Sequence, residues 1–210
     1  MPRPALQLAL DGSLEAALRL LDVVGDGVDR IEIGTPLIVR EGVRAIRTVR
    51  AAVRLVPIVA DLKIMDAGEE EADIAFDAGA DEVTVLGVAD DATVHGAVAS
   101  ARAHGGRVVA DLIQTPDPSV RGARLLELGA DLLAVHVGSD AQRRDLRPFE
   151  ALRSLREALP DAPLAVAGGI DAATAVRVSP YAPAVVIVGS GIANAPDPRA
   201  AAMRIREALA

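Results

Sequence analysis

The sequence predicts an α/β protein, a single (β/α)8 barrel formed by residues 1–210. Short runs of aliphatic and β-branched residues alternate with amphipathic helical patterns along the whole chain. Eight such units fit within 210 residues, and no linker or long insertion interrupts them. Strands that alternate with helices pair in parallel through right-handed crossovers, which is the arrangement of a barrel of this kind.

The expected strands recur at regular intervals. They lie near residues 5–10, 28–33, 57–62, 81–86, 107–113, 131–136, 163–167 and 184–188. A doubly wound open sheet is the alternative arrangement of the same units. Closure into a barrel is favoured because an open sheet would leave exposed edge strands.

Helical patterns fill the segments between these strands. The clearest are Ser13 to Val24, Glu41 to Val53, Asp91 to His104 and Arg199 to Leu209. Many begin near Asp, Ser or Pro and end near Gly or Pro, as helices commonly do. Gly-Ala-Asp at 79–81 and again at 129–131 places a helix-ending glycine directly before a strand.

Composition excludes several classes of protein. Thirty acidic and 22 basic residues give a net charge of −8, and with only Phe76, Phe149 and Tyr181 as aromatics the chain is not expected to bind nucleic acid. No apolar run is long enough to span a membrane, and the N-terminus does not resemble a signal peptide, so a cytoplasmic protein is expected. Without cysteine, any metal must bind oxygen or nitrogen ligands.

Lys63 is the only lysine among the 22 basic residues. An ammonium group is a compact point charge whose pKa can be tuned, whereas guanidinium is planar and always charged. A chain that otherwise uses arginine therefore suggests a functional role for this lysine.

Ionisable side chains gather at the carboxyl ends of the predicted strands. Successive side chains of a strand point to opposite faces, which allows the inward-facing residues to be assigned. Those at or just past the carboxyl ends are Asp11, Glu32, Asp61, Lys63, Asp111 and His136. Strand ends elsewhere carry almost no charge, and barrel enzymes hold their chemistry at this end. Four acids against one lysine would repel one another unless a cation joined them, so we expect Mg²⁺, or Mn²⁺ in its place.

Two glycine-rich segments follow the last two strands. They are Gly168-Gly169-Ile170 and Gly189-Ser190-Gly191-Ile192. Loops in these positions form the usual phosphate site of the barrel, through backbone N–H groups. We therefore expect Gly168, Gly169, Gly189 and Ser190 to bind a phosphorylated small substrate.

Several motifs resemble one family. Residues 61–68, Asp-Leu-Lys-Ile-Met-Asp-Ala-Gly, carry the Asp-x-Lys-x-x-Asp signature of the orotidine 5′-monophosphate decarboxylase superfamily. Residues 32–37, 83–87, 90–93 and 165–170 resemble the 3-hexulose-6-phosphate synthases within it. The resemblance extends from about residue 5 to the C-terminus.

The resemblance implies an aldehyde-lyase of the ribulose monophosphate pathway. Such an enzyme condenses D-ribulose 5-phosphate with formaldehyde, reversibly and with Mg²⁺, through a 1,2-enediolate to D-arabino-hex-3-ulose 6-phosphate. By resemblance, Glu32 and Asp61 bind Mg²⁺, His136 is the acid–base, and the groups that contact the substrate are Asp11, Lys63, Asp66 and Asp111. The resemblance also implies a homodimer with active sites at the interface, where Asp66 reaches the partner's site.

Two alternatives stay open. The sister 3-keto-L-gulonate-6-phosphate decarboxylases carry arginines just after the strand-six histidine and in the loop after strand eight. Here residues 136–140 read His-Val-Gly-Ser-Asp and residues 189–191 read Gly-Ser-Gly, which favours the synthase. A non-catalytic barrel that binds phosphosugars is the other alternative, and the complete acid–base set disfavours it.

Overall fold

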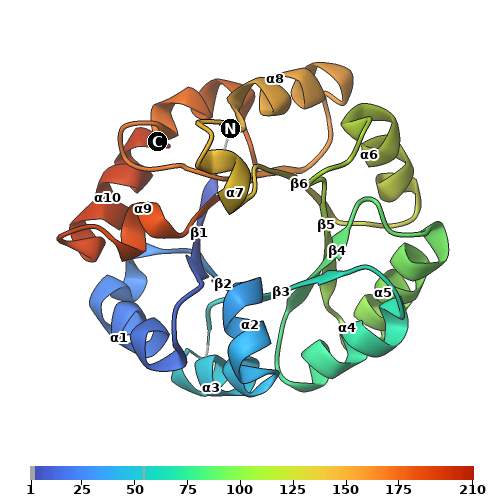
Figure 1. Ribbon diagram of the computed structural model, residues 1–210, viewed down its shortest axis with the longest axis horizontal. Coiled ribbons are helices and arrows are strands. Elements are labelled where there is room, and N and C mark those ends of the chain that lie inside the picture. Colours follow the sequence, from blue (N-terminus) through green and yellow to red (C-terminus); the bar gives the residue numbers. More distant parts are fainter. Residues whose placement is uncertain (1–2, 54) are drawn as a thin grey trace.

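A closed barrel of eight parallel strands lies inside a ring of helices in the computed structural model, which describes residues 3–53 and 55–210 (Figure 1). Each strand pairs with the next along the chain, and β8 pairs with β1. The predicted (β/α)8 barrel is confirmed. The open-sheet alternative is wrong, because the pairing of Leu6 with Val186 and of their neighbours closes the sheet.

The strands lie where the sequence predicted them. They are β1 Ala5–Leu10, β2 Arg30–Ile33, β3 Ile58–Ile64, β4 Glu82–Leu86, β5 Arg107–Asp111, β6 Leu132–His136, β7 Leu164–Ala167 and β8 Val185–Val188. Several bounds differ from the prediction by one or two residues. In particular, β3 continues beyond residue 62, because Ile64 pairs with Val85 of β4.

The helices cover the outside of the barrel. They are α1 Leu14–Val24, α2 Thr35–Glu41, α3 Arg44–Ala52, α4 Gly68–Asp77, α5 Asp91–His104, α6 Pro118–Glu127, α7 Ser139–Gln142, α8 Phe149–Ala158, α9 Ser190–Ala193 and α10 Pro198–Ala208, with short 3-10 turns η1 Gly25–Gly27, η2 Ala175–Arg177 and η3 Ser179–Tyr181. The predicted helix from Glu41 to Val53 is wrong at its start. Gly42 ends α2 with a φ of 60°, so α3 begins only at Arg44.

Alternation along the strands divides the apolar residues into two cores. Leu6, Leu8 and Leu10 of β1 pack between the barrel and the helices, as predicted. A smaller cluster fills the barrel interior and consists of Val109, Leu132, Ala134, Ala165 and Val185. The inward-facing residues beyond this cluster are therefore free to form a site at one end of the barrel.

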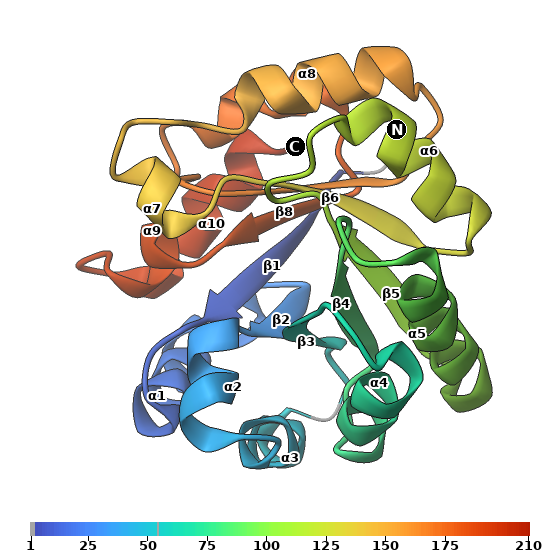
Figure 2. The same cartoon turned by 45° about the vertical axis from the view of Figure 1, so that its right-hand side comes forward.

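The carboxyl ends of the strands share one side of the molecule with the short helices α2 and α7. Figure 2 shows the arrowheads of β1 and β8 pointing toward that side. Within residues 3–53 and 55–210, no helix is both long enough and apolar enough to cross a membrane.

Candidate active site

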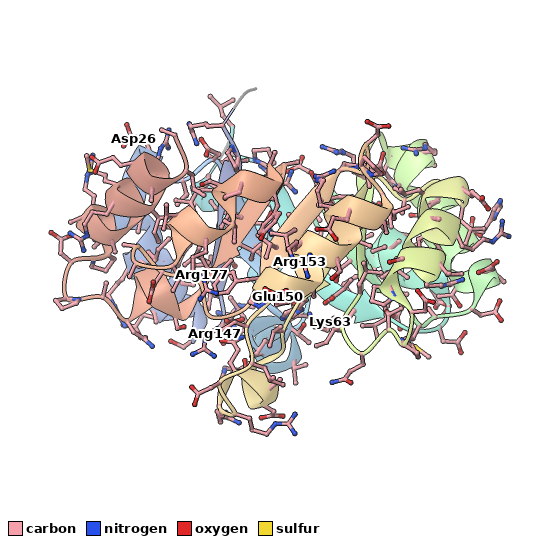
Figure 3. The ribbon with its side chains drawn as sticks, turned by 90° about the horizontal axis from the view of Figure 1, so that it is seen from above. Asp26, Lys63, Arg147, Glu150, Arg153 and Arg177 are labelled. Carbon is pink, nitrogen blue, oxygen red and sulfur yellow. The ribbon has the colours of Figure 1, made fainter. Side chains whose placement is uncertain are left out.

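A cavity of about 470 Å³ opens at the carboxyl ends of the strands. Ten of the predicted site residues line it, namely Asp11, Glu32, Asp61, Lys63, Asp111, His136, Gly168, Gly169, Gly189 and Ser190. Figure 3 shows Lys63 and Arg147 toward one end of the barrel and Asp26 toward the other. The structure thus brings the predicted charges and the predicted phosphate loops into a single space.

An irregularity in β3 directs Lys63 into this cavity. The pairing of β3 with β4 shifts register between Ala60 and Ile64, and Lys63 has a φ of 52°. Residues other than glycine rarely adopt this left-handed conformation, and its cost is about 1–3 kcal/mol. The Lys63 backbone N–H donates to Thr84 Oγ1 at 2.9 Å, which holds the chain in this conformation.

The Asp61 carboxylate is the centre of the hydrogen-bond network. Thr84 Oγ1 lies 2.8 Å from its Oδ1, and Thr35 Oγ1 lies 2.8 Å from its Oδ2. Lys63 Nζ donates to both oxygens, at 2.8 and 2.6 Å. Asp61 is buried, so these donors compensate for the lost hydration of its charge.

The Lys63 ammonium bridges two carboxylates. Besides Asp61 it contacts Asp111 Oδ2 at 3.2 Å. Burial alone would lower the pKa of Lys63, but the negative charges of Asp61 and Asp111 outweigh that effect and raise it. The side chain is therefore a permanent cation at the wall of the cavity.

Asp111 also orients His136. The imidazole Nδ1 lies 2.8 Å from Asp111 Oδ2, and the Ile113 backbone N–H donates to Asp111 Oδ1 at 2.9 Å. Burial would raise the pKa of Asp111, but His136 and Lys63 outweigh it and lower the pKa. An ionised carboxylate only accepts, so Nδ1 carries the proton and Nε2 is the atom left for proton transfer.

Two further acids carry the excess negative charge of the cavity. Burial, and then the charge of Asp61, raise the pKa of Glu32 to about 8. The same two causes, in the same order, raise the pKa of Asp11. Both shifts mean that a positive charge placed between these carboxylates would be stabilised.

The two glycine-rich loops pack so closely that side chains would not fit. Gly168 has a φ of 114°, and a Cβ there would lie 2.5 Å from the Val137 carbonyl oxygen. A Cβ on Gly191 would lie 2.4 Å from the Ile170 carbonyl oxygen. The backbone therefore approaches the cavity directly at these loops, as binding of a phosphate by N–H groups requires.

Comparison with known proteins identifies the family. Residues 4–205 match the model of the orotidine 5′-phosphate decarboxylase / HUMPS family. The chain belongs to this family. The resemblance predicted from the motifs is thus confirmed at the level of the whole chain.

Within the family, the chain is similar to named synthases over nearly its whole length. The 3-hexulose-6-phosphate synthase 3 of Staphylococcus saprophyticus is 43% identical over 205 residues, which cover 97% of this chain and 98% of the relative. The crystal structure of 3-hexulose-6-phosphate synthase from Salmonella typhimurium has a TM-score of 0.95 and 44% identity, covering 98% of both chains. KGPDC from Streptococcus mutans, solved as a complex with a D-pentose 5-phosphate, has a TM-score of 0.91 and 26% identity, covering 98% of this chain and 97% of that chain.

The donor set fits a divalent cation held by two carboxylates. In the described part of the chain, no three His, Asp or Glu side chains are close enough to hold a metal ion by themselves. Mg²⁺ commonly binds only one or two protein carboxylates and completes its octahedron with water and substrate oxygens. Glu32 and Asp61, the predicted ligands, both line the cavity and influence each other's charge, which suits such a site.

Asp66 lies apart from the other predicted residues. It follows the end of β3, is exposed, and does not line the cavity. Its Oδ1 accepts a hydrogen bond from the Ala67 backbone N–H at 2.8 Å. Its predicted role in a partner's site stays a prediction.

The structure adds several residues that the sequence analysis did not assign a role. Thr35 and Thr84 bind Asp61, and Gln142 and Arg144 of the segment after β6 line the cavity. Alternation along β4 would have pointed Thr84 inward. Arg144 brings a guanidinium close to the region where the decarboxylases carry theirs, although it lies farther along the chain from His136.

The expectation that charge is nearly absent from the other strand ends is wrong. Arg30 and Glu82, at the amino ends of β2 and β4, are buried and form an ion pair. Inward alternation from Glu32 would have placed Arg30 inside the barrel. The pair can be buried because each charge has an opposite partner.

Proposed function

We propose that this protein is an aldehyde-lyase, a 3-hexulose-6-phosphate synthase that condenses D-ribulose 5-phosphate with formaldehyde to D-arabino-hex-3-ulose 6-phosphate. The observation that carries the proposal is the continuous chain from Asp61 through Lys63 and Asp111 to His136 inside a cavity bordered by two glycine loops. Identities of 43% and 44% to named synthases, against 26% to KGPDC, support the synthase over the decarboxylase.

The phosphate group of the substrate fits the loops after β7 and β8. Gly168, Gly169, Gly189 and Ser190 line that side of the cavity, and Arg144 adds a positive charge nearby. Anchoring the phosphate fixes the distance of the reacting carbons from His136 and Lys63 and lowers the entropic cost of reaction. The complex of KGPDC, which shares the fold, supports a pentose phosphate as ligand.

The first step is removal of a proton from C1 of ribulose 5-phosphate. His136 Nε2 accepts this proton while Asp111 holds the ring through Nδ1. The electrons of the broken C–H bond move to give a 1,2-enediolate, and the Lys63 ammonium stabilises its developing negative charge. When bound by Glu32 and Asp61, Mg²⁺ would polarise the substrate carbonyl as a Lewis acid.

The second step forms the new carbon–carbon bond. C1 of the enediolate attacks the carbon of formaldehyde, the carbonyl of formaldehyde becomes an alkoxide, and His136 returns the proton to that alkoxide. The former C2 regains its carbonyl and becomes C3 of the product. The steps are reversible, because each group ends in its starting state.

A paired assay tests the proposal. Purified protein with Mg²⁺ is given ribulose 5-phosphate plus formaldehyde in one reaction and 3-keto-L-gulonate 6-phosphate in another. We expect a larger kcat/KM for the first reaction. A larger value for the second would establish the decarboxylase, and no turnover of either substrate would favour a non-catalytic barrel that binds phosphosugars.

A further inference from the structure

A line of polar side chains runs inside the barrel from the cavity toward the amino ends of the strands. Its members are Gln7, Arg30, Glu32 and Glu82, none of which is more than 8% exposed. The register of β1 with β2 pairs Gln7 with Arg30 and Ala9 with Glu32. Burying so many polar groups is unfavourable unless each one is satisfied, so their contacts are informative.

The contacts form one chain of hydrogen bonds. Arg30 Nη2 donates to Glu82 Oε2 at 2.5 Å, and Arg30 Nε donates to Gln7 Oε1 at 2.8 Å. Gln7 Nε2 then donates to Glu32 Oε2 at 2.5 Å. Because guanidinium only donates, the atom of Gln7 that faces Arg30 must be its oxygen, and its NH₂ group must face Glu32.

The charges along this chain are arranged unequally. Arg30 is paired with Glu82, which also lies 3.6 Å from Arg107. The neutral amide of Gln7 separates Arg30 from Glu32. An arginine in direct contact would neutralise the Glu32 carboxylate, whereas an amide orients it and leaves its charge available to the cavity.

We propose that Gln7 is a positioning residue for Glu32, held in one orientation by the Arg30–Glu82 ion pair, and that this chain sets the affinity of the site for a divalent cation. The inference rests on the proposed function, in which Glu32 binds the metal. A hydrogen bond to one carboxylate oxygen fixes the rotamer of Glu32 and directs the other oxygen to the ion.

The test is Gln7→Met, which keeps an unbranched side chain and removes the amide. Binding of Mn²⁺ to the purified protein is measured by electron paramagnetic resonance of the free ion. We expect affinity about 10- to 100-fold weaker than wild type. Synthase activity should fall at low Mg²⁺ and recover at saturating Mg²⁺, which a merely destabilised protein would not show.

Ser100→Ala is the matched control. Ser100 is as buried as Gln7 and its hydroxyl donates to Asp73 Oδ1 at 2.5 Å, outside the cavity. Its loss should lower the thermal midpoint and leave Mn²⁺ affinity unchanged. Wild-type Mn²⁺ affinity in Gln7→Met would overturn the inference.

A second variant removes the ion pair and keeps Gln7. Arg30→Met with Glu82→Met leaves no unpaired buried charge, so the barrel can fold. Mn²⁺ affinity should fall, and adding Gln7→Met should change it little further, since the residues act in series. Additive effects would overturn the proposed chain. Failure of the wild-type protein to bind Mn²⁺ would also refute it, while the formaldehyde assay would still decide the proposed function.

Discussion

Lys63 combines a charge requirement with a shape requirement. Its ammonium contacts Asp61 and Asp111 from a left-handed backbone position. Lys63→Arg keeps the charge but replaces a compact donor with a planar fork that is too large for the same place. We expect kcat to fall about 100-fold or more, because stabilisation of the enediolate oxygen depends on donor position. Steady-state kinetics with ribulose 5-phosphate and formaldehyde measures the effect.

The control for this variant is Arg19→Lys, an exposed exchange between the same two residue types on α1. It should have wild-type kinetics. A wild-type rate for Lys63→Arg would show that any cation suffices at this position.

His136 is expected to be the base that removes the C1 proton. His136→Asn keeps a polar group but cannot accept a proton near neutral pH. Exchange of the C1 proton of ribulose 5-phosphate with deuterated solvent, followed by NMR without formaldehyde, should stop. His104→Asn, at the far end of α5 from the cavity, should exchange normally. Undiminished exchange in His136→Asn would assign the proton transfer to another group.

Glu32 couples stability to pH when no cation is bound. Its pKa is 4.5 in an unfolded chain and about 8 in the folded protein. Between these values the folded protein binds more protons at this position, so the free energy of unfolding falls as pH rises. In EDTA, the thermal midpoint of wild type should therefore fall more steeply across this range than that of Glu32→Gln.

Metal removal supplies the second half of this prediction. EDTA should abolish turnover and Mg²⁺ should restore it, and at the upper end of the pH range Mg²⁺ should raise the midpoint of wild type but not of Glu32→Gln. Parallel pH curves for the two proteins, together with full activity in EDTA, would remove Glu32 from the metal site.

At the scale of elements, the loop after β7 depends on Gly168. Its φ of 114° and its contact with the Val137 carbonyl leave no room for a side chain. Gly168→Ala should destabilise the protein by about 1–3 kcal/mol and raise KM for ribulose 5-phosphate more than KM for formaldehyde. Denaturant unfolding and steady-state kinetics measure both effects.

Gly105→Ala separates strain from site geometry. Gly105 also has a positive φ, 67°, but a Cβ there would meet no atom within 4 Å. It should lower stability without changing either KM. Equal effects of the two variants on KM would argue against a phosphate role for the loop.

The elements that the sequence predicted are those with a clear period. Strand alternation placed Glu32, Asp61 and Asp111 on the inner face, and the structure agrees. Helices α7 and α9, of four residues each, are too short to show a helical period. The residues around α7, including Arg144, were therefore missed.

Backbone irregularity has no pattern of hydrophobicity either. Simple alternation along β3 brought Lys63 inward, yet the chain achieves this through a register shift and a left-handed residue. The Gln7–Arg30 contact was also beyond prediction, because it depends on the register between two strands and not on either strand alone.

At the scale of the whole molecule, the cavity gathers ten predicted residues but leaves Asp66 outside. A single chain thus uses both ends of its Asp-x-Lys-x-x-Asp motif in different places. If the protein is a symmetric dimer with sites at the interface, each exposed Asp66 is positioned to complete the site of its partner. Hybrid dimers can test this, because they separate residues that act within one protomer from those that act across the interface.

We expect hybrids of Asp66→Asn with Lys63→Met to be active although each parent is inactive. The Asp66→Asn protomer keeps its own Lys63 and receives an intact Asp66 from its partner, so one of the two sites is complete. The hybrids are prepared by co-expression with two affinity tags and assayed for formaldehyde-dependent turnover. Hybrids of Lys63→Met with His136→Asn should stay inactive, because each protomer then lacks a residue of its own cavity. An inactive Asp66→Asn hybrid would mean that Asp66 serves the chain that carries it.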